Sequence, residues 1–340
     1  MTTQPAFRVV RRGGLGLIWY PRAVLVSLVL VAICIGIALL GLLSGSTDLP
    51  LQVVLDGLQG HGEGVDIVRG MRLPRVMCGL VVGACLGVSG AVFQSLGRNA
   101  LASPDIIGVA SGAALGAVTA IVVFHLGRGG TALGALVGCV LASGLGHVLA
   151  RGRVRVAQRL VLVGIGIGAF CQGLTTLLLT QIDPDIAIAG QKWLTGTLNT
   201  RSWDDLAPAA LGLALLPVVV WCARHLNALE MGDDLARQLG VDADATRRRA
   251  AAAGVAMCAL AVCAVGPVAF VALASPHLAR RLCLNATVPV VPAALAGATL
   301  LLGADVAGQS LPDGWGMPVG IATGILGGAY LALVLTRRSS

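Results

Sequence analysis

The sequence has 340 residues, of which 56% are hydrophobic and only 12% are charged. An ordinary soluble domain carries about a quarter charged residues, so a soluble globular protein is excluded, because these charges cannot cover the surface of such a chain. The formal net charge of +8 would suit a nucleic-acid-binding protein, but the positions of the arginines favour an explanation by membrane topology.

The chain begins with a basic segment that is followed by an apolar run at residues 23–43. This run is longer than the apolar part of a signal peptide, which has about 7 to 15 residues, and no clear small-residue cleavage site follows it. A helix of this length can cross a hydrocarbon core of about 30 Å. We therefore interpret the run as a first membrane span that is retained.

Apolar runs of similar length recur along the whole chain and predict an all-α, polytopic membrane protein. We expect about ten spans in one transmembrane domain over residues 23–336. Gly266 and Pro267 mark either a turn between two short helices or a kink in one long helix. The predicted spans are 23–43, 74–96, 104–125, 131–150, 158–180, 204–224, 249–266, 267–282, 289–308 and 316–336.

The basic residues indicate how these spans are oriented. With ten spans, most of the 24 lysines and arginines fall in the segments that share a side with the N-terminus, and basic residues accumulate on the cytoplasmic side. We therefore predict a protein of the plasma or inner membrane with both termini in the cytoplasm. Residues 1–22 and 337–340 form the cytoplasmic tails, and about 225–248 form a large cytoplasmic loop.

The sequence lacks the motifs of several enzyme classes. The only lysine, Lys192, stands in Gln-Lys-Trp, so the Gly-Lys-Ser/Thr of a phosphate-binding loop is absent. There is no HExxH pair, and the nine cysteines include no CxxC pair. We therefore expect a chain that is not an enzyme, has no catalytic residues and holds neither a metal nor a cofactor.

A gradient-driven secondary transporter remains an alternative of a different class, because such proteins keep ionisable residues within their spans. The candidates here are Asp305 and His147. A membrane-embedded enzyme or a structural subunit is a further alternative, although no nucleophile, base and ligand constellation supports an enzyme.

The predicted cytoplasmic loop contains a short amphipathic segment. Asp233 and Asp234 can begin a helix, Leu235 and Leu239 share one face, and Gly240 can end it. The small apolar face with acids beside an arginine suits docking to a protein partner. An interfacial helix that lies on lipid is the alternative interpretation.

Four segments of the chain, taken in order, resemble one family of transport proteins. They include the motifs Arg72-Leu-Pro-Arg75 and Pro276-His277-x-x-Arg280 and cover residues 72–108, 193–198, 231–240 and 266–328. In these segments the sequence resembles the FecCD-type permeases of ABC importers for iron siderophores, haem and vitamin B12. The resemblance implies a type II importer permease of about ten helices, similar in fold to the vitamin B12 permease.

The resemblance also implies a function and a set of partners. The chain would form, with a second identical or paralogous permease, a pathway for a ferric siderophore such as ferric enterobactin. Two cytoplasmic ATPases would use ATP and Mg²⁺, and a periplasmic or lipid-anchored protein would deliver the solute. Gln309 stands where vitamin B12 relatives have a third docking arginine, which favours the siderophore branch; haem or a cobalamin-like solute is the alternative.

The resemblance assigns roles to residues of this sequence. It implies that the binding protein docks on Arg72, Arg75 and Gln309, for which snorkelling to the membrane surface is the alternative, and that Asn99 and Leu101 form the inner gate. It implies an ATPase-coupling segment that comprises Gly232, Asp233, Asp234, Ala236, Arg237, Leu239 and Gly240. Pro276, His277 and Arg280 match the family motif, and weakly polar side chains that we expect along the pathway are Ser89, Gln94 and Thr119.

Overall fold

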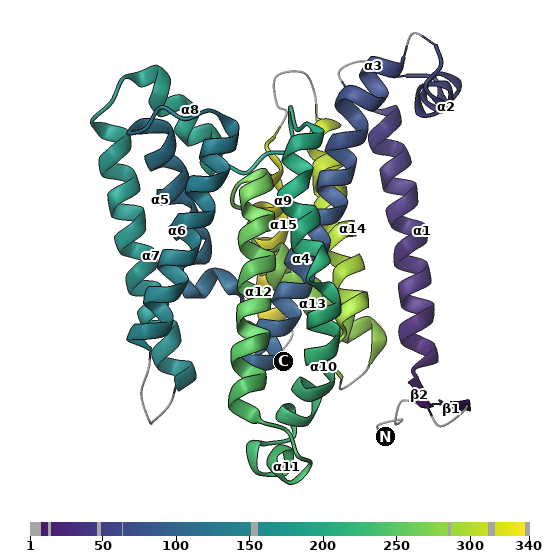
Figure 1. Ribbon diagram of the computed structural model, residues 1–340. Coiled ribbons are helices and arrows are strands. Elements are labelled where there is room, and N and C mark those ends of the chain that lie inside the picture. The colour runs from purple at the N-terminus through teal and green to yellow at the C-terminus, as the bar shows by residue number, and fades with distance from the viewer. Residues whose placement is uncertain are drawn as a thin grey trace.

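In the computed structural model the chain is a bundle of helices that run roughly along one direction (Figure 1). One end of the bundle carries α2 (Leu51–Gln59), and the opposite end carries α11 (Asp233–Gln238). We refer to these ends as the α2 end and the α11 end. The structure describes residues 8–12, 15–45, 49–62, 64–150, 156–284, 287–311 and 317–336.

Each predicted span coincides with a helix or with a pair of helices. In the described part of the chain, seven helical segments are long and apolar enough to cross a membrane, and two further apolar helices are shorter. The helices are α1 (Pro21–Leu43), α4 (Leu73–Gly97), α5 (Val109–Val122), α6 (Arg128–Leu149), α7 (Val156–Thr180), α9 (Trp203–Ala214) with α10 (Leu216–Glu230), α12 (Ala243–Val265), α13 (Val271–Cys283), α14 (Val290–Gln309) and α15 (Val319–Thr336). The prediction of a multi-pass helical membrane protein is confirmed.

Short elements complete the chain. At the α2 end, α3 (Val65–Ile67) and the π-helical turn η1 (Val68–Arg72) lead into α4. The 3₁₀ turn η2 (Pro104–Ile107) precedes α5, and α8 (Pro184–Leu194) follows α7. Because η2 occupies the start of the predicted span 104–125, α5 itself has only 14 residues.

The all-α fold class is confirmed, and the N-terminal tail adds one short hairpin that the sequence analysis did not anticipate. Strands β1 (Arg8–Arg12) and β2 (Leu15–Trp19) pair antiparallel beside the foot of α1 (Figure 1). A Gly-Gly dipeptide between two short runs with β-branched residues is a hairpin signal. We missed this signal because the arginines of the segment suggested only a charged tail. The C-terminal tail predicted at 337–340 lies outside the described residues.

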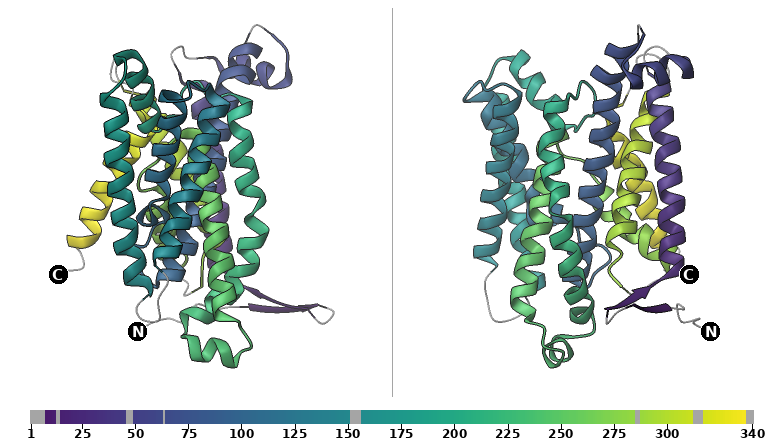
Figure 2. Two further views of the ribbon diagram at one scale, coloured as in Figure 1. Left: turned by 60° about the vertical axis from the view of Figure 1, so that its left-hand side comes forward. Right: turned by 45° about the vertical axis from the view of Figure 1, so that its right-hand side comes forward.

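Helix α4 forms the centre of the bundle, where α12, α13 and α14 surround it (Figure 2). Of the 18-residue apolar stretch within Val65–Gly97, 83% is buried inside the bundle, compared with 11% of the corresponding stretch of α1. Small residues allow this packing: a Cβ atom at Gly83 would lie 2.5 Å from the carbonyl oxygen of Gly297 on α14. Backbones that approach so closely are typical of membrane helices with small-xxx-small spacing.

Two helix boundaries differ from the predicted ones. The loop predicted at about 225–248 is much shorter, since α10 continues to Glu230 and α12 begins at Ala243. The arginines at 247–249 lie within α12. A helix can carry charged residues where it extends past the hydrocarbon core. Between α12 and α13 the structure has a turn, in which Gly266 takes a φ of +84°, and not a kink in one long helix.

Candidate functional site

The short helix α11 projects from the bundle and divides its residues between two faces. Gly232 precedes it with a φ of +122° and Gly240 follows it with a φ of +78°, backbone conformations that favour glycine. Ala236, a residue of the helix itself, is fully buried. In contrast, Arg237 has a side chain that is 60% exposed, and Leu239 is 63% exposed. Leu235 is also 44% exposed, so the outward face presents at least two apolar side chains together with charged ones.

The two adjacent aspartates of α11 have different surroundings. The side chain of Asp234 is 95% exposed, and it forms a loose ion pair with Arg237 at 3.6 Å. The carboxylate of Asp233 faces the bundle, where Oδ1 accepts a 2.6 Å hydrogen bond from Arg98 at the end of α4. Arg247 of α12 donates to both oxygens of the same carboxylate, at 2.9 and 2.6 Å. Asp233 thus joins three helices.

These hydrogen bonds also change the acidity of Asp233. Donation from Arg247, and more weakly from Arg98, lowers the pKa of this carboxyl from 3.8 to about 2, against the smaller opposing effect of burial. The same hydrogen bonds raise the pKa of Arg247. The carboxylate is therefore charged at any physiological pH.

The predicted inner gate lies directly beside this cluster. Arg98 ends α4 with a φ of +46°, and Asn99 and Leu101 follow in the connection to η2. The side-chain Oδ1 of Asn99 accepts a hydrogen bond of 3.0 Å from the backbone N–H of Leu101, which fixes the turn. Both residues are exposed, and Leu101 is 40% exposed.

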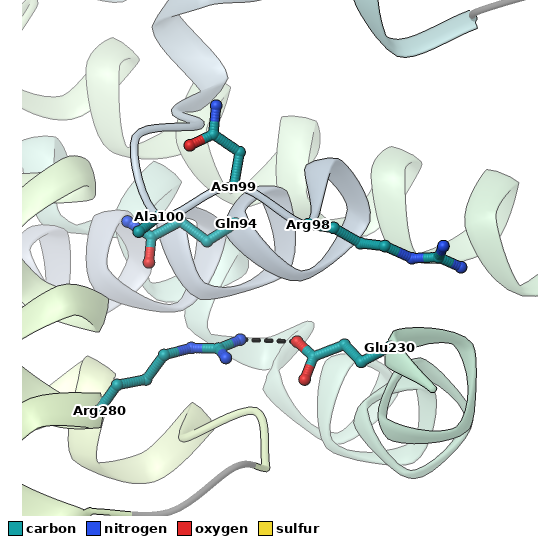
Figure 3. Close-up of a pocket in the computed structure, with 6 residues that line it drawn as sticks. All are labelled: Gln94, Arg98, Asn99, Ala100, Glu230 and Arg280. Atoms are coloured by element: carbon teal, nitrogen blue, oxygen red, sulfur yellow. Dashed lines mark hydrogen bonds and ion pairs between the residues drawn. The ribbon is translucent and has the colours of Figure 1, made fainter. Parts of the chain in front are cut away.

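A cavity of about 240 Å³ opens where α4, α10 and α13 meet at the α11 end (Figure 3). Arg280 reaches across from α13 to Glu230 of α10, with a distance of 2.7 Å from Nη2 to Oε1. Gln94 donates from Nε2 to the carbonyl of Leu273 at 2.9 Å. The structure therefore brings together Gln94 of the predicted pathway, Asn99 of the predicted gate and Arg280 of the family motif. The cavity is lined by Gln94, Arg98, Asn99, Ala100, Glu230 and Arg280.

Other predicted residues lie elsewhere. Ser89 is buried between α4 and α12 and donates to the carbonyl of Gly254 at 2.7 Å. Thr119 donates to the carbonyl of Leu115 within its own helix, also at 2.7 Å. Pro276 is buried inside α13. The ring of His277 meets that of Tyr330 edge to face, with centroids 5.9 Å apart. The structure thus separates Ser89 and Thr119 from the cavity.

The predicted docking arginines both have internal contacts near the α2 end. Arg72 is 8% exposed, and its Nη1 donates to the last carbonyls of α1, those of Leu42 and Leu43, at 2.7 and 2.8 Å. A cation at this place is favourable because the carbonyls at a helix C-terminus lack partners within the helix. Arg75 forms a bidentate ion pair with Asp305, and Gln309 donates to the same carboxylate.

Sequence reasoning missed Arg98, Glu230 and Arg247 as site residues. Each is a charged residue at or near the end of a helix, and each faces an opposite charge on another helix. Opposite charges at the ends of neighbouring spans on one side of the membrane are a signal that could have identified them. Their pairing could not be derived without the helix arrangement.

Comparison with known proteins shows similarity to subunits of transport systems. A profile of the FecCD transport family matches residues 28–337. The ferric enterobactin transport system permease protein FepG of Escherichia coli is 38% identical over 321 residues, which cover 94% of this chain and 97% of FepG. The hemin transport system permease protein HmuU of Yersinia pestis is 36% identical over 79% of this chain and 82% of HmuU.

A solved structure agrees with these relatives. It is described as an inward-facing conformation of a "metal-chelate type ABC transporter" and superposes with a TM-score of 0.79 at 26% identity, over 92% of this chain and 99% of the other. The helix arrangement, the exposed α11 and the sequence matches over nearly the whole length agree with one another. The chain therefore belongs to the FecCD transport family.

Proposed function

We propose that this chain is the permease subunit of an ATP-driven importer for a ferric siderophore. The observation that carries the proposal is the 38% identity to a ferric enterobactin permease over 94% of the chain. The similarity to a metal-chelate transporter structure supports it independently. The sequence contains no phosphate-binding loop, and in this proposal a partner subunit that binds ATP and Mg²⁺ supplies the driving force.

In this proposal the α11 end faces the cytoplasm and carries the ATPase. The coupling segment from Gly232 to Gly240 fits this role because its outward face is accessible. Leu239 offers an apolar contact, and Asp234 and Arg237 offer charges of both signs. Both termini lie on the cytoplasmic side in this orientation, as the distribution of basic residues indicates.

The α2 end then faces the binding protein. Arg75 keeps 21% of its side chain exposed, and Gln309 lies beside it on the same carboxylate, so acidic residues of a binding protein would compete with Asp305 for Arg75. A contact with Arg72 requires its guanidinium to leave the carbonyls of α1. We therefore propose Arg75 and Gln309 as the nearer docking residues and Arg72 as a third.

The solute would pass between this chain and a second permease, identical or paralogous. Asn99 and Leu101 would form the gate at the cytoplasmic end, with Gln94 in the cavity behind it. Ser89 and Thr119 remain proposed pathway residues, although their hydroxyls are bonded to backbone carbonyls in this structure. We propose that Pro276 and His277 shape α13 and that Arg280 holds it to α10.

The test is uptake of ferric enterobactin into vesicles that contain this chain, its second permease, its ATPase and the binding protein. We expect uptake that requires ATP and persists in the presence of an uncoupler. Uptake that survives removal of the ATPase but stops with the uncoupler would instead identify a gradient-driven secondary transporter.

Haem is the second candidate solute, because a hemin permease is 36% identical to this chain. Competition distinguishes the two: an excess of hemin should leave ferric enterobactin uptake unchanged if the chain serves siderophores. Inhibition by hemin, together with hemin uptake, would assign the pathway to haem.

A further inference from the structure

The carboxylate of Asp233 is held on the inner side of α11 by two arginines from different helices. Arg98 lies 2.6 Å from Oδ1, and Arg247 binds both oxygens. The three side chains are about one third to one half exposed, at 33%, 45% and 35%. A partner protein that docks on the outer face of α11 would thus meet Asp234 and would find Asp233 already occupied.

Arg98 connects this carboxylate to the gate. It directly precedes Asn99 and closes α4 in a left-handed backbone conformation, with a φ of +46°. Its Nη2 also donates to the carbonyl of Leu229, at 2.6 Å, on the last turn of α10. The residue therefore holds the gate turn both to α11 and to the end of α10. A displacement of α11 must either pull on Arg98 or break charge-assisted hydrogen bonds, which are among the stronger ones in proteins.

A second ion pair holds the opposite wall of the same cavity. Glu230, three residues before Asp233 in the chain, forms an ion pair of 2.7 Å with Arg280 of α13. Gln94, Arg98 and Asn99 form the other wall (Figure 3). The segment from Glu230 to Asp233 thus contacts both walls, so that its movement changes the width of the cavity at the gate.

We propose that Asp233 is a positioning residue that transmits the movement of α11 to the gate turn through Arg98, whereas the neighbouring Asp234 contacts the ATPase. This inference rests on the proposed importer function. Arg247 keeps the carboxylate oriented toward Arg98 by occupying both of its oxygens. The link remains intact while the gate moves, because α11 and the turn shift together.

The first experiment compares Asp233→Asn with its matched neighbour Asp234→Asn in the complete importer reconstituted in vesicles, with ferric enterobactin as the solute. We expect Asp233→Asn to retain the ATPase and its hydrolysis but to lower the solute imported per ATP about tenfold, the effect of one charge-assisted hydrogen bond on an equilibrium. Asp234→Asn should weaken retention of the ATPase without changing the amount of solute imported per ATP hydrolysed. An unchanged ratio in Asp233→Asn would overturn the proposal.

The second measurement follows the gate itself. In a background with Ala100→Cys, reaction with a membrane-impermeant maleimide reports access to the turn, and the nine buried native cysteines serve as the baseline in the parent protein. We expect ATP to change the reaction rate with Asp233 present and to have no effect in Asp233→Asn. A merely structural role of Asp233 would leave the response to ATP in place.

Rescue by a cross-link tests whether the link persists through the cycle. Arg98→Cys combined with Asp233→Cys should be uncoupled as a free dithiol and should recover coupling when a short bis-maleimide joins the two thiols. Both single variants, treated with the same reagent, should stay uncoupled. A cross-link that blocks transport would show that the pair must break, contrary to the proposal. Absence of ATP-dependent uptake in the parent protein would contradict the importer function itself, a separate result.

Discussion

Arg75 and Asp305 form an ion pair with two hydrogen bonds that joins α4 to α14. The guanidinium Nε and Nη2 lie 2.8 Å from Oδ2 and Oδ1 of the carboxylate. Asp305 is only 3% exposed, and Gln309 donates to it at 2.9 Å. A charge that is left buried without its partner is far more costly than a paired one, so the folded state depends on both residues together.

Removal of one partner should therefore cost more than removal of both. We expect Arg75→Ala to lower the free energy of unfolding by roughly 3 kcal/mol, because it leaves the Asp305 charge unpaired. The double variant Arg75→Ala/Asp305→Ala should be more stable than Arg75→Ala alone. Thermal unfolding in detergent, followed by tryptophan fluorescence, measures both, with the exposed Arg128→Ala as control. Equal losses in the single and double variants would contradict a buried pair.

The charge at position 309 should control capture of the binding protein. We expect Gln309→Arg to raise the affinity for the binding protein several-fold and Gln309→Glu to lower it, because the proposed partner surface is acidic. The difference between the two variants should shrink as salt is added, since exposed charges are screened. Sedimentation of the binding protein with vesicles measures capture. The same affinity in both variants would remove Gln309 from the docking surface.

Asp233 should give the protein a stability that depends on pH only under acidic conditions. Its folded-state pKa is lowered from 3.8 to about 2, so its contribution is complete above about pH 5 and is lost as the pH falls toward and below about 2. We expect the stability difference between the parent protein and Asp233→Asn to stay constant from neutral pH to about pH 5 and then to shrink. Asp234→Asn, with an exposed side chain, should show little difference. A stability difference between the parent protein and Asp233→Asn that grows as the pH falls would contradict a lowered pKa for Asp233.

Gly83 should be required for the contact between α4 and α14. A Cβ atom there would lie 2.5 Å from the carbonyl oxygen of Gly297 and 2.7 Å from Cα of Ala298, both backbone atoms that cannot rotate away. We expect Gly83→Ala to cost about 2 kcal/mol through overpacking. Gly324→Ala in α15, where the added atom meets nothing within 4 Å, should be neutral or slightly stabilising. Similar thermal stability of the two variants would show that the helices can separate without cost.

The membrane spans could be predicted because each needs an apolar run of a certain length, which is a local property of the sequence. The position of a break at Gly266 could be predicted, but the sequence could not distinguish a turn from a kink there, since glycine and proline suit both. The break between α9 and α10 before Pro217 was missed for a similar reason. One continuous apolar run covers both helices and hides the break.

The site was only partly predictable, because its contacts join distant positions. Arg98 and Asp233 are 135 residues apart in the sequence and Arg75 and Asp305 are 230 apart, so no spacing rule could pair them. The coupling segment and the gate were identified by resemblance to a family. That resemblance could not show that Asp233 faces inward while Asp234 faces outward, which depends on how α11 lies against α4 and α12.

The contrast between α1 and α4 has a consequence for biosynthesis. Helix α1 emerges first, has the highest mean hydropathy of the seven segments at 3.1 and buries the least, so it can rest alone in lipid as soon as it leaves the ribosome. Helix α4 emerges early too, yet its neighbours α12, α13 and α14 all belong to the final third of the chain. The central helix must therefore wait in the bilayer, sheltered by insertion machinery or loosely held by α1, until the final third of the chain is synthesised and closes around it.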